Sequence, residues 1–448
     1  MKRDDAAPRR ARRTSGRNAA QGAARSGSPG RARGGTRARV GAALTPEALR
    51  AVALAEVLRF EAPADAALRA FFRRHPSLGR RDRGEIAEAV FDVLRHRRLY
   101  AHLARGAVGP LEARLLARSD ERRAGRLSLP ELPFALRFSL PDWLADALVA
   151  GHGAARAESL AAALLQPAPL DLRVNTLKAT PAQVVASLAA AGIDAQPLPQ
   201  WPGALRVAGK PALERSAAFE SGWCEVQDLG SQLAAALVAP RRGQTVVDLC
   251  AGAGGKTLAL AAAMRSTGQV YACDVSAPRL LRMRRRLERC GATNVQPMAI
   301  AGERDPRLER LHARADAVLV DAPCTGTGTL RRNPDLKWRT GPDELARLVE
   351  AQRSILSAAA ALVRPGGALV YATCSLLAQE NDEQVAWFEA RHPDWQRRPA
   401  GEVLEAQGAR LDPQASADGL LRLLPDRDDC DGFFAARWER PKQQGSEG

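Results

Sequence analysis

The stretch Thr245-Val246-Val247-Asp248-Leu249-Cys250-Ala251-Gly252-Ala253-Gly254-Gly255-Lys256-Thr257 decides the fold of this chain. Its apolar first half is typical of a buried strand, and a glycine-rich turn then leads directly into a helix. Glycines let the backbone approach a ligand closely, and a helix N-terminus favours negative charge. Asp274 ends the next predicted strand, where its carboxylate can accept hydrogen bonds from ribose hydroxyls. The stretch therefore predicts a loop that binds a nucleotide-type cofactor.

Three such ligands fit the loop in principle: NAD(P), ATP and S-adenosylmethionine. Gly255-Lys256-Thr257 resembles the end of a phosphate-binding Walker A motif, but that motif requires glycine five residues before Gly255, where this chain has Cys250. The dinucleotide pattern Gly-x-Gly-x-x-Gly is also incomplete, because Thr257 stands at its last position. These two departures from the motifs therefore count against ATP and NAD(P) as the cofactor.

Strands and helices alternate on both sides of this loop. Strands are predicted at 245–250, 269–275, 294–300, 315–322, 367–373 and 431–438, and helices at 228–238, 256–265, 277–290, 343–363 and 379–390. Such alternation predicts βαβ units, a mostly parallel sheet and helices on both faces. The expected class is therefore α/β, with this domain at about 226–440.

Two smaller regions precede this domain. Residues 41–150 carry apolar side chains at helical spacing, and we expect a helical domain there. Residues 151–225 read as a small α/β module, with a strand at 170–175 and a helix at 181–192 that ends at a glycine.

Both ends of the chain are expected to be tails. The first 40 residues hold twelve Lys or Arg against two Asp and have little to bury, so we expect a disordered basic tail. Such an arm binds polyanions through phosphate contacts, which makes RNA a candidate partner. Residues 441–448 are expected to form a flexible tail.

The cysteine and histidine content excludes several classes of protein. The seven cysteines are odd in number and show no Cys-x-x-Cys pair, and the six histidines are scattered. This pattern predicts free thiols in a reducing compartment, the cytoplasm, with neither a disulfide framework nor a metal site. The chain has no apolar run of the length that spans a membrane, so we expect no membrane partner.

Two of the cysteines stand out because each follows a predicted strand. Cys324 lies in Asp321-Ala322-Pro323-Cys324 and Cys374 lies in Ala372-Thr373-Cys374-Ser375. Ligands of open α/β sheets bind outside the carboxyl ends of the strands, so both thiols are expected beside the cofactor. Most buried cysteines are only small hydrophobes, and that interpretation suits the other five: Cys224, Cys250, Cys273, Cys290 and Cys430.

Thiols beside a methyl donor suit chemistry at carbon 5 of cytosine. This carbon is a poor nucleophile, but a thiolate that adds to carbon 6 makes carbon 5 enamine-like and able to attack a sulfonium methyl group. A carboxylate such as Asp321 could hydrogen bond at N3 of the base. These residues leave open which of the two thiols is the nucleophile.

The chain resembles the Sun/Fmu family of RNA cytosine-5 methyltransferases over about residues 170–440, and more weakly over 45–150. The motifs that carry the resemblance are Arg173-Val174-Asn175, Gln227-Asp228 with Ser231, the loop 250–257, Asp274, and the segments 321–328 and 371–381. The resemblance implies a Rossmann-like class I methyltransferase domain at 226–440. It also implies a small RNA-recognition-like module at 151–225 and a NusB-like RNA-binding region at 41–150.

The resemblance further implies the chemistry of each site residue. Cys374 would be the nucleophile, Cys324 would assist release of the methylated base, and Asp321 would lie against the target base and the cofactor. The methionine end of S-adenosylmethionine would be wrapped by Cys250, Ala251, Gly252, Ala253, Gly254, Gly255 and Lys256, and its ribose held by Asp274. Lys256 would also lie near the reacting groups. The family has Pro where this chain has Ala253, and an acidic residue where it has Ala301.

The expected substrate is RNA, with ribosomal RNA favoured and tRNA or another RNA as the enzymatic alternative. A non-enzymatic alternative is a ribosome-assembly factor that binds RNA and S-adenosylmethionine without turnover. The paired thiols count against this second alternative, because a binding protein has no need of them.

Overall fold

The computed structural model describes residues 45–128 and 131–442. The basic tail expected at 1–40 lies outside the described residues, as do residues 443–448 of the expected C-terminal tail.

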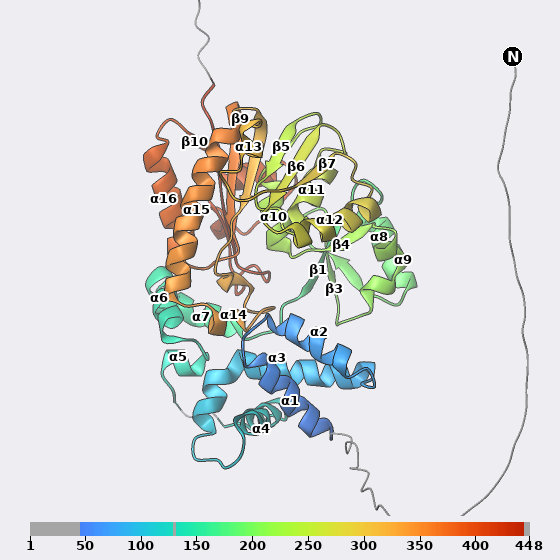
Figure 1. Ribbon diagram of the computed structural model, residues 1–448, viewed down its shortest axis with the longest axis vertical. Helices are drawn as coiled ribbons and strands as arrows, with labels where there is room; N and C mark the ends of the chain where they lie inside the picture. The colour runs from blue at the N-terminus through green and yellow to red at the C-terminus, as the bar shows by residue number, and fades with distance from the viewer. Residues whose placement is uncertain (1–44, 129–130, 443–448) are drawn as a thin grey trace, which may run out of the picture. The chain divides into compact units, whose positions relative to one another are not determined.

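The N-terminal region is helical from Pro46, and its helices continue past the predicted boundary at 150 to Leu164 (Figure 1). Its helices are α1 (Pro46–Val57), α2 (Ala64–Arg74), α3 (Arg80–Leu103), α4 (Leu111–Arg123), α5 (Phe134–Arg137), α6 (Asp142–His152) and α7 (Ala154–Leu164). Helix α1 begins where the Thr45 hydroxyl accepts a hydrogen bond from the Ala48 N–H at 3.2 Å, and Pro46 follows this cap. The first four helices share one core, which includes Leu54, Val93 and Leu115.

A small four-stranded antiparallel sheet follows, in the order β2-β3-β1-β4. Its elements are β1 (Leu170–Val174), α8 (Pro181–Ala190), β2 (Ala195–Pro197), β3 (Ala204–Val207), the 3-10 turn Leu213–Arg215, α9 (Ala217–Glu220) and β4 (Cys224–Val226). Apolar side chains of α8, such as Val184 and Leu188, pack with Leu172 and Leu205 of the sheet.

The large domain is built on an eight-stranded sheet whose main path runs β10-β12-β9-β8-β5-β6-β7, with β11 paired to β12. Five strands run parallel: β5 (Thr245–Asp248), β6 (Gln269–Asp274), β7 (Val295–Ala299), β8 (Ala315–Asp321) and β9 (Val363–Thr373). Three strands complete it in antiparallel pairings: β10 (Gln396–Arg397), β11 (Leu421–Leu423) and β12 (Phe433–Glu439). The predicted mostly parallel sheet is therefore confirmed, whereas β10 and β11 were not predicted.

Helices cover both faces of this sheet because its strands alternate two apolar sets of side chains. Val246 and Val270 face one cluster, which includes Leu233 of α10 and Leu260 of α11. A second cluster lies on the other face of the sheet. It contains Val247, Cys273 and Val318 from the strands, and Leu356 and Phe388 from α15 and α16. The helices of the domain are α10 (Leu229–Ala236), α11 (Gly255–Ala263), α12 (Ala277–Cys290), α13 (Pro306–Glu309), α14 (Leu336–Arg339), α15 (Pro342–Leu362), α16 (Asp382–Arg391) and α17 (Ala400–Glu405).

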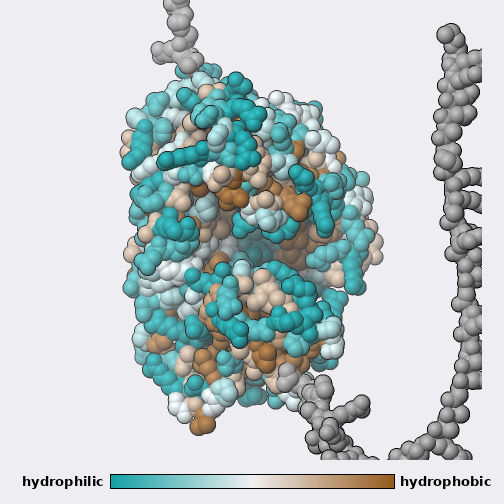
Figure 2. Space-filling view, in the orientation of Figure 1, coloured by the Kyte–Doolittle hydropathy of each residue, from teal (hydrophilic) through white to brown (hydrophobic). Residues whose placement is uncertain are grey.

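Short 3-10 turns occupy Thr327–Thr329, Ala378–Glu380 and Pro413–Ala415. The helix predicted at 379–390 therefore begins three residues later, at Asp382, because the preceding residues form one of these turns. Together the layers give the α/β, Rossmann-like arrangement expected from the sequence. Over residues 45–128 and 131–442, no helix is both long and apolar enough to cross a membrane. Figure 2 shows a hollow near the middle of the face in view, bordered by both hydrophilic and hydrophobic residues.

Candidate active site

The glycine-rich loop leaves the sheet at the carboxyl end of β5 and enters α11, as predicted. Gly252 and Gly254 have φ angles of 57° and 86°, in the left-handed region that other residues adopt only with strain. A Cβ atom on Gly254 would also lie 2.5 Å from the Met283 side chain of α12. Glycine is thus required at position 254 by the backbone conformation and by the closeness of α12.

Asp274 lies beside this loop at the carboxyl end of β6. Its Oδ2 accepts the Gly252 N–H at 2.7 Å, and its Oδ1 accepts the Ser276 N–H at 2.7 Å. The residue is 6% exposed, and each carboxylate oxygen keeps a further lone pair. A fixed, ionisable acceptor at the edge of an open glycine loop fits the ribose of a nucleoside-type cofactor.

Lys256 and Asp321 form a second charged pair at the same edge of the sheet. The Lys256 Nζ donates to Asp321 Oδ2 at 2.8 Å and lies 5.0 Å from the ring centre of Phe433. Burial lowers the pKa of Lys256, but the charge and hydrogen bond of Asp321 outweigh it, so the pKa is raised above its ordinary value. Lys256 is therefore a cation held against Asp321.

The two predicted thiols meet in the structure. Strands β8 and β9 are parallel neighbours with Asp321 opposite Ala372, so the residues that follow each strand lie side by side. The Sγ atoms of Cys324 and Cys374 are 3.5 Å apart. The hydrogen bond with Cys374, together with burial, raises the pKa of the Cys324 thiol well above its ordinary value. Cys324 therefore keeps its proton at neutral pH.

A buried carboxylate that the sequence did not single out joins the two cysteine loops. Glu380 is fully buried in the turn before α16. One of its oxygens accepts the Thr325 N–H at 2.8 Å and the Gln352 amide at 3.0 Å. Its other oxygen accepts the hydroxyl groups of Thr325 and Ser375. Glu380 thus holds the residue that follows each thiol.

Three further hydrogen bonds fix the same turn. Asn381 Nδ2 donates to the Ser375 carbonyl at 2.9 Å, and the Thr373 hydroxyl donates to Asn381 Oδ1 at 2.6 Å. The Gly328 N–H donates to the Cys374 carbonyl at 2.9 Å. The sequence signal for this network was the segment 371–381, which carried the family resemblance but gave no role to Glu380 or Asn381.

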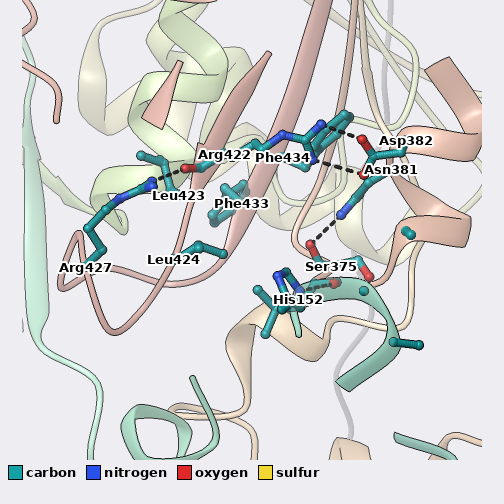
Figure 3. A pocket seen from close by; sticks show the side chains of 14 residues that line it. His152, Ser375, Asn381, Asp382, Arg422, Leu423, Leu424, Arg427, Phe433 and Phe434 are labelled. Atoms are coloured by element: carbon teal, nitrogen blue, oxygen red, sulfur yellow. Dashed lines mark hydrogen bonds and ion pairs between the residues drawn. The ribbon is translucent and has the colours of Figure 1, made fainter. Parts of the chain in front are cut away.

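A cavity of about 500 Å³ lies next to this turn (Figure 3). One of the residues that line it, Ser375, directly follows the predicted nucleophile Cys374 in the chain. Phe433 also lines it, and Phe433 contacts Lys256. The Arg422 and Asp382 side chains on its wall are paired with each other. Ser375 and Phe433 therefore place the cavity beside the site, although Cys324, Cys374, Asp321 and Lys256 are not among its lining residues.

Asp248, under the glycine loop, predicts a pH dependence of stability. Burial raises its pKa to about 7, although a hydrogen bond from the Thr257 hydroxyl at 2.7 Å lowers it. The folded state then holds this proton more tightly than the unfolded state, so stability contributed at low pH is lost as pH rises from about 4 to about 7. We expect Asp248→Asn, which can still accept from Thr257, to remove this loss. Its unfolding free energy relative to the wild type should rise by up to about 4 kcal/mol between pH 4 and pH 8 in urea titrations. A constant difference across that range would contradict the assignment.

Known proteins match the chain across this site. Residues 235–439 match the model of the 16S rRNA methyltransferase RsmB/F family, and residues 140–214 match its ferredoxin-like domain. A probable ribosomal RNA small subunit methyltransferase B of Synechocystis is 36% identical over 324 residues, 72% of either chain. A probable enzyme of the same name from Bacillus subtilis is 33% identical over 68% of this chain and 67% of its own.

Solved structures agree with these sequence matches. The crystal structure of PH0851 has a TM-score of 0.75 and 26% identity, and it covers 89% of this chain and all of its own. A methyltransferase homologue from Pyrococcus horikoshii has a TM-score of 0.58 and 30% identity, over 68% of this chain and 97% of its own. The matched residues include the glycine loop, both thiols and the turn that joins them. The chain therefore belongs to the RsmB/F family of methyltransferases.

Proposed function

We propose that this protein transfers a methyl group from S-adenosylmethionine to carbon 5 of a cytosine in small-subunit ribosomal RNA, through a covalent adduct with Cys374. The observation that carries the proposal is the 3.5 Å approach of the Cys324 and Cys374 sulfur atoms at the carboxyl edge of the sheet. The relatives named as small-subunit rRNA methyltransferases support the choice of substrate. With such a substrate the enzyme would act in the cytoplasm.

The cofactor contacts follow from the loop geometry. Residues 250–256 would hold the methionine end, and Asp274 would accept hydrogen bonds from the ribose hydroxyls. When bound, S-adenosylmethionine supplies the electrophilic methyl group. Where the family has an acidic residue near the adenine this chain has Ala301, and the next acidic residue, Glu303, accepts the Ser354 hydroxyl at 2.6 Å. That partner holds Glu303 beside α15.

The two thiols have different roles in the reaction with the base. The Cys374 sulfur forms a bond to carbon 6, and the electron pair of the 5,6 double bond moves toward carbon 5, which becomes nucleophilic. The Asp321 carboxylate, held by Lys256, can accept a hydrogen bond from N3 once N3 carries a proton, and that proton neutralises the negative charge that the addition places on the ring. After methylation a base removes the carbon-5 proton, the double bond re-forms, and the bond to Cys374 breaks. Cys324 retains its proton, so it can donate a hydrogen bond to the departing Cys374 thiolate.

The two upstream regions are proposed to bind the RNA. Residues 41–150 would form a NusB-like contact, and the module at 151–225 would position the target strand. Helix α14 supports this arrangement, because the Trp338 indole N–H donates to the Leu94 carbonyl of α3 at 2.8 Å. Lys337 donates to the Arg95 carbonyl at 2.8 Å in the same way. These bonds attach the helical region to the domain that carries the thiols.

The reaction is tested by nucleoside mass spectrometry. Unmodified 16S rRNA, the assembled small subunit and unmodified tRNA are each incubated with the protein and S-adenosylmethionine carrying a labelled methyl group. We expect labelled 5-methylcytidine in 16S rRNA, free or assembled, and none with Cys374→Ala. Label in tRNA alone would mean that the substrate is tRNA and not ribosomal RNA. Absence of label from every RNA would favour an RNA-binding assembly factor.

A further inference from the structure

Helix α12, which follows Asp274, carries a charge pattern that the reaction does not use. Its sequence, Ala-Pro-Arg-Leu-Leu-Arg-Met-Arg-Arg-Arg-Leu-Glu-Arg-Cys, contains six arginines and one glutamate. The side chains at helical spacing that face the sheet are apolar and buried: Leu280, Met283, Leu287 and Cys290. The arginines therefore occupy the rest of the helix surface.

Two of the six arginines have structural partners. Arg286 and Arg289 both pair with Glu225 of β4, whose side chain is 3% exposed. Burial raises the pKa of Glu225, but the two guanidinium groups and a hydrogen bond from the Cys290 thiol outweigh it, so the pKa is lowered below its ordinary value. Arg286 also donates to the Ala253 carbonyl at 2.7 Å. The pair thus attaches α12 to the small module on one side and to the glycine loop on the other.

The other four arginines form what we term the arginine face: Arg279, Arg282, Arg284 and Arg285. All four are exposed, and within residues 45–128 and 131–442 none has an ion-pair or side-chain hydrogen-bond partner. On α15, by contrast, Arg347 and Arg353 are each paired with a glutamate three residues earlier. Neighbouring like charges on a helix repel one another, so the arginine face costs stability that a bound polyanion would recover.

A hollow beside the arginine face adds apolar surface to its positive charge. It has a volume of about 530 Å³ and lies between α12 and the end of the small module, lined by Phe219, Glu225, Val226, Arg285, Arg286 and Arg289. Val226 is 46% exposed, and Leu281 on α12 is 65% exposed. The Arg289 guanidinium stacks on Phe219, 3.9 Å from the ring centre. Arginines next to exposed apolar side chains suit a nucleic-acid strand, whose phosphates are charged and whose bases are flat and apolar.

The arginine face lies on a helix that starts close to the candidate active site. Helix α12 (Figure 1) begins at Ala277, three residues after Asp274. Its Arg286 side chain donates a hydrogen bond to the Ala253 carbonyl of the glycine loop. We propose that the arginine face binds backbone phosphates of the RNA substrate, and that the adjoining hollow holds a stretch of the same strand next to the cofactor loop. The identity of the ligand as RNA rests on the proposed function.

The test compares two pairs of exposed arginines. Arg282→Gln/Arg285→Gln removes two charges from the arginine face. The matched control, Arg310→Gln/Arg314→Gln, removes two exposed charges near Thr245, at the opposite, amino edge of the sheet. Equilibrium binding of each protein to unmodified 16S rRNA is measured by filter retention from 50 to 300 mM KCl. Methyl transfer is measured at saturating RNA and at varied S-adenosylmethionine.

We expect the arginine-face variant to bind RNA roughly tenfold more weakly at 150 mM salt, and the slope of log K against log salt to fall by about 1.5. Its kcat and its KM for S-adenosylmethionine should match the wild type, because neither residue contacts the reacting groups. The control should keep the wild-type slope. An unchanged slope in the arginine-face variant, or an equal loss in both variants, would overturn the proposal. A wild-type protein that binds RNA but never methylates it would refute the proposed function and leave this comparison valid.

Discussion

Replacing Cys374 with alanine should lower methyl transfer by at least about three orders of magnitude, while leaving RNA and cofactor binding near wild-type levels. Without the Cys374 sulfur, carbon 5 of the target base has no route to the enamine-like state, and enzymes that lose a nucleophile lose most of their rate. Cys374 lies on a turn fixed by backbone hydrogen bonds, such as that from the Gly328 N–H, so the smaller side chain should leave the fold intact. Initial rates of tritium transfer from labelled cofactor would measure the loss.

The matched variant is Cys324→Ala, at the neighbouring thiol 3.5 Å away. On the proposed mechanism Cys374 can still attack in this variant, but its departure would lack the hydrogen bond proposed for Cys324. We expect a covalent protein–RNA complex to accumulate on denaturing gels with Cys324→Ala, and none with Cys374→Ala. The opposite result, a complex with Cys374→Ala alone, would mean that Cys324 is the nucleophile and that Cys374 assists release.

Glu380→Gln should reduce kcat by about 10²-fold with little change in the KM for RNA or for S-adenosylmethionine. Glu380 touches no reacting atom, but it holds Thr325 and Ser375, the residues that follow the two thiols. An amide retains one acceptor oxygen and presents two donors, so the loops shift without unfolding. A displacement of about 1 Å at a catalytic group costs on the order of 10²-fold in rate.

Two companion variants separate positioning from stability. Glu380→Ala leaves several buried donors without an acceptor and should destabilise the fold by on the order of 3–5 kcal/mol. Asp382→Asn removes a carboxylate two residues further on, which pairs with Arg422 on the cavity wall, and should keep a wild-type kcat. A Glu380→Gln enzyme with a wild-type kcat, or with a higher KM and an unchanged kcat, would rule out the positioning role.

Where local signals decide the structure, the sequence was sufficient. The helix at 277–290 was predicted with the bounds that the structure has, because Pro278 marks its start and buried residues recur at helical spacing through Cys290. The parallel core strands were likewise predicted to within a few residues, since each is an apolar run between turn residues. The meeting of Cys324 and Cys374 followed from the rule that parallel strands end at the same edge.

Where long-range contacts decide the structure, the sequence was insufficient. Strands β10 and β11 span two and three residues, and they form because β12 has one edge that β9 does not pair. The predicted helix at 379–390 includes Glu380, whose role depends on Thr325 and Gln352, 55 and 28 residues away in the chain. A buried acidic residue shortly after a strand-end thiol was the available signal, but its partners lie on other elements.

The covalent adduct can be trapped and located directly. RNA transcribed with 5-fluorocytidine carries fluorine where the carbon-5 proton must leave, so the bond between sulfur and carbon 6 cannot be released after methylation. Nuclease and trypsin digestion of the trapped complex separates the two thiols, because Arg331 and Arg353 lie between them in the chain. Mass spectrometry should find a methylated fluorocytidine nucleotide on the peptide that contains Cys374. The same nucleotide on the Cys324 peptide, or no adduct on either peptide from a protein that methylates ordinary RNA, would contradict the mechanism.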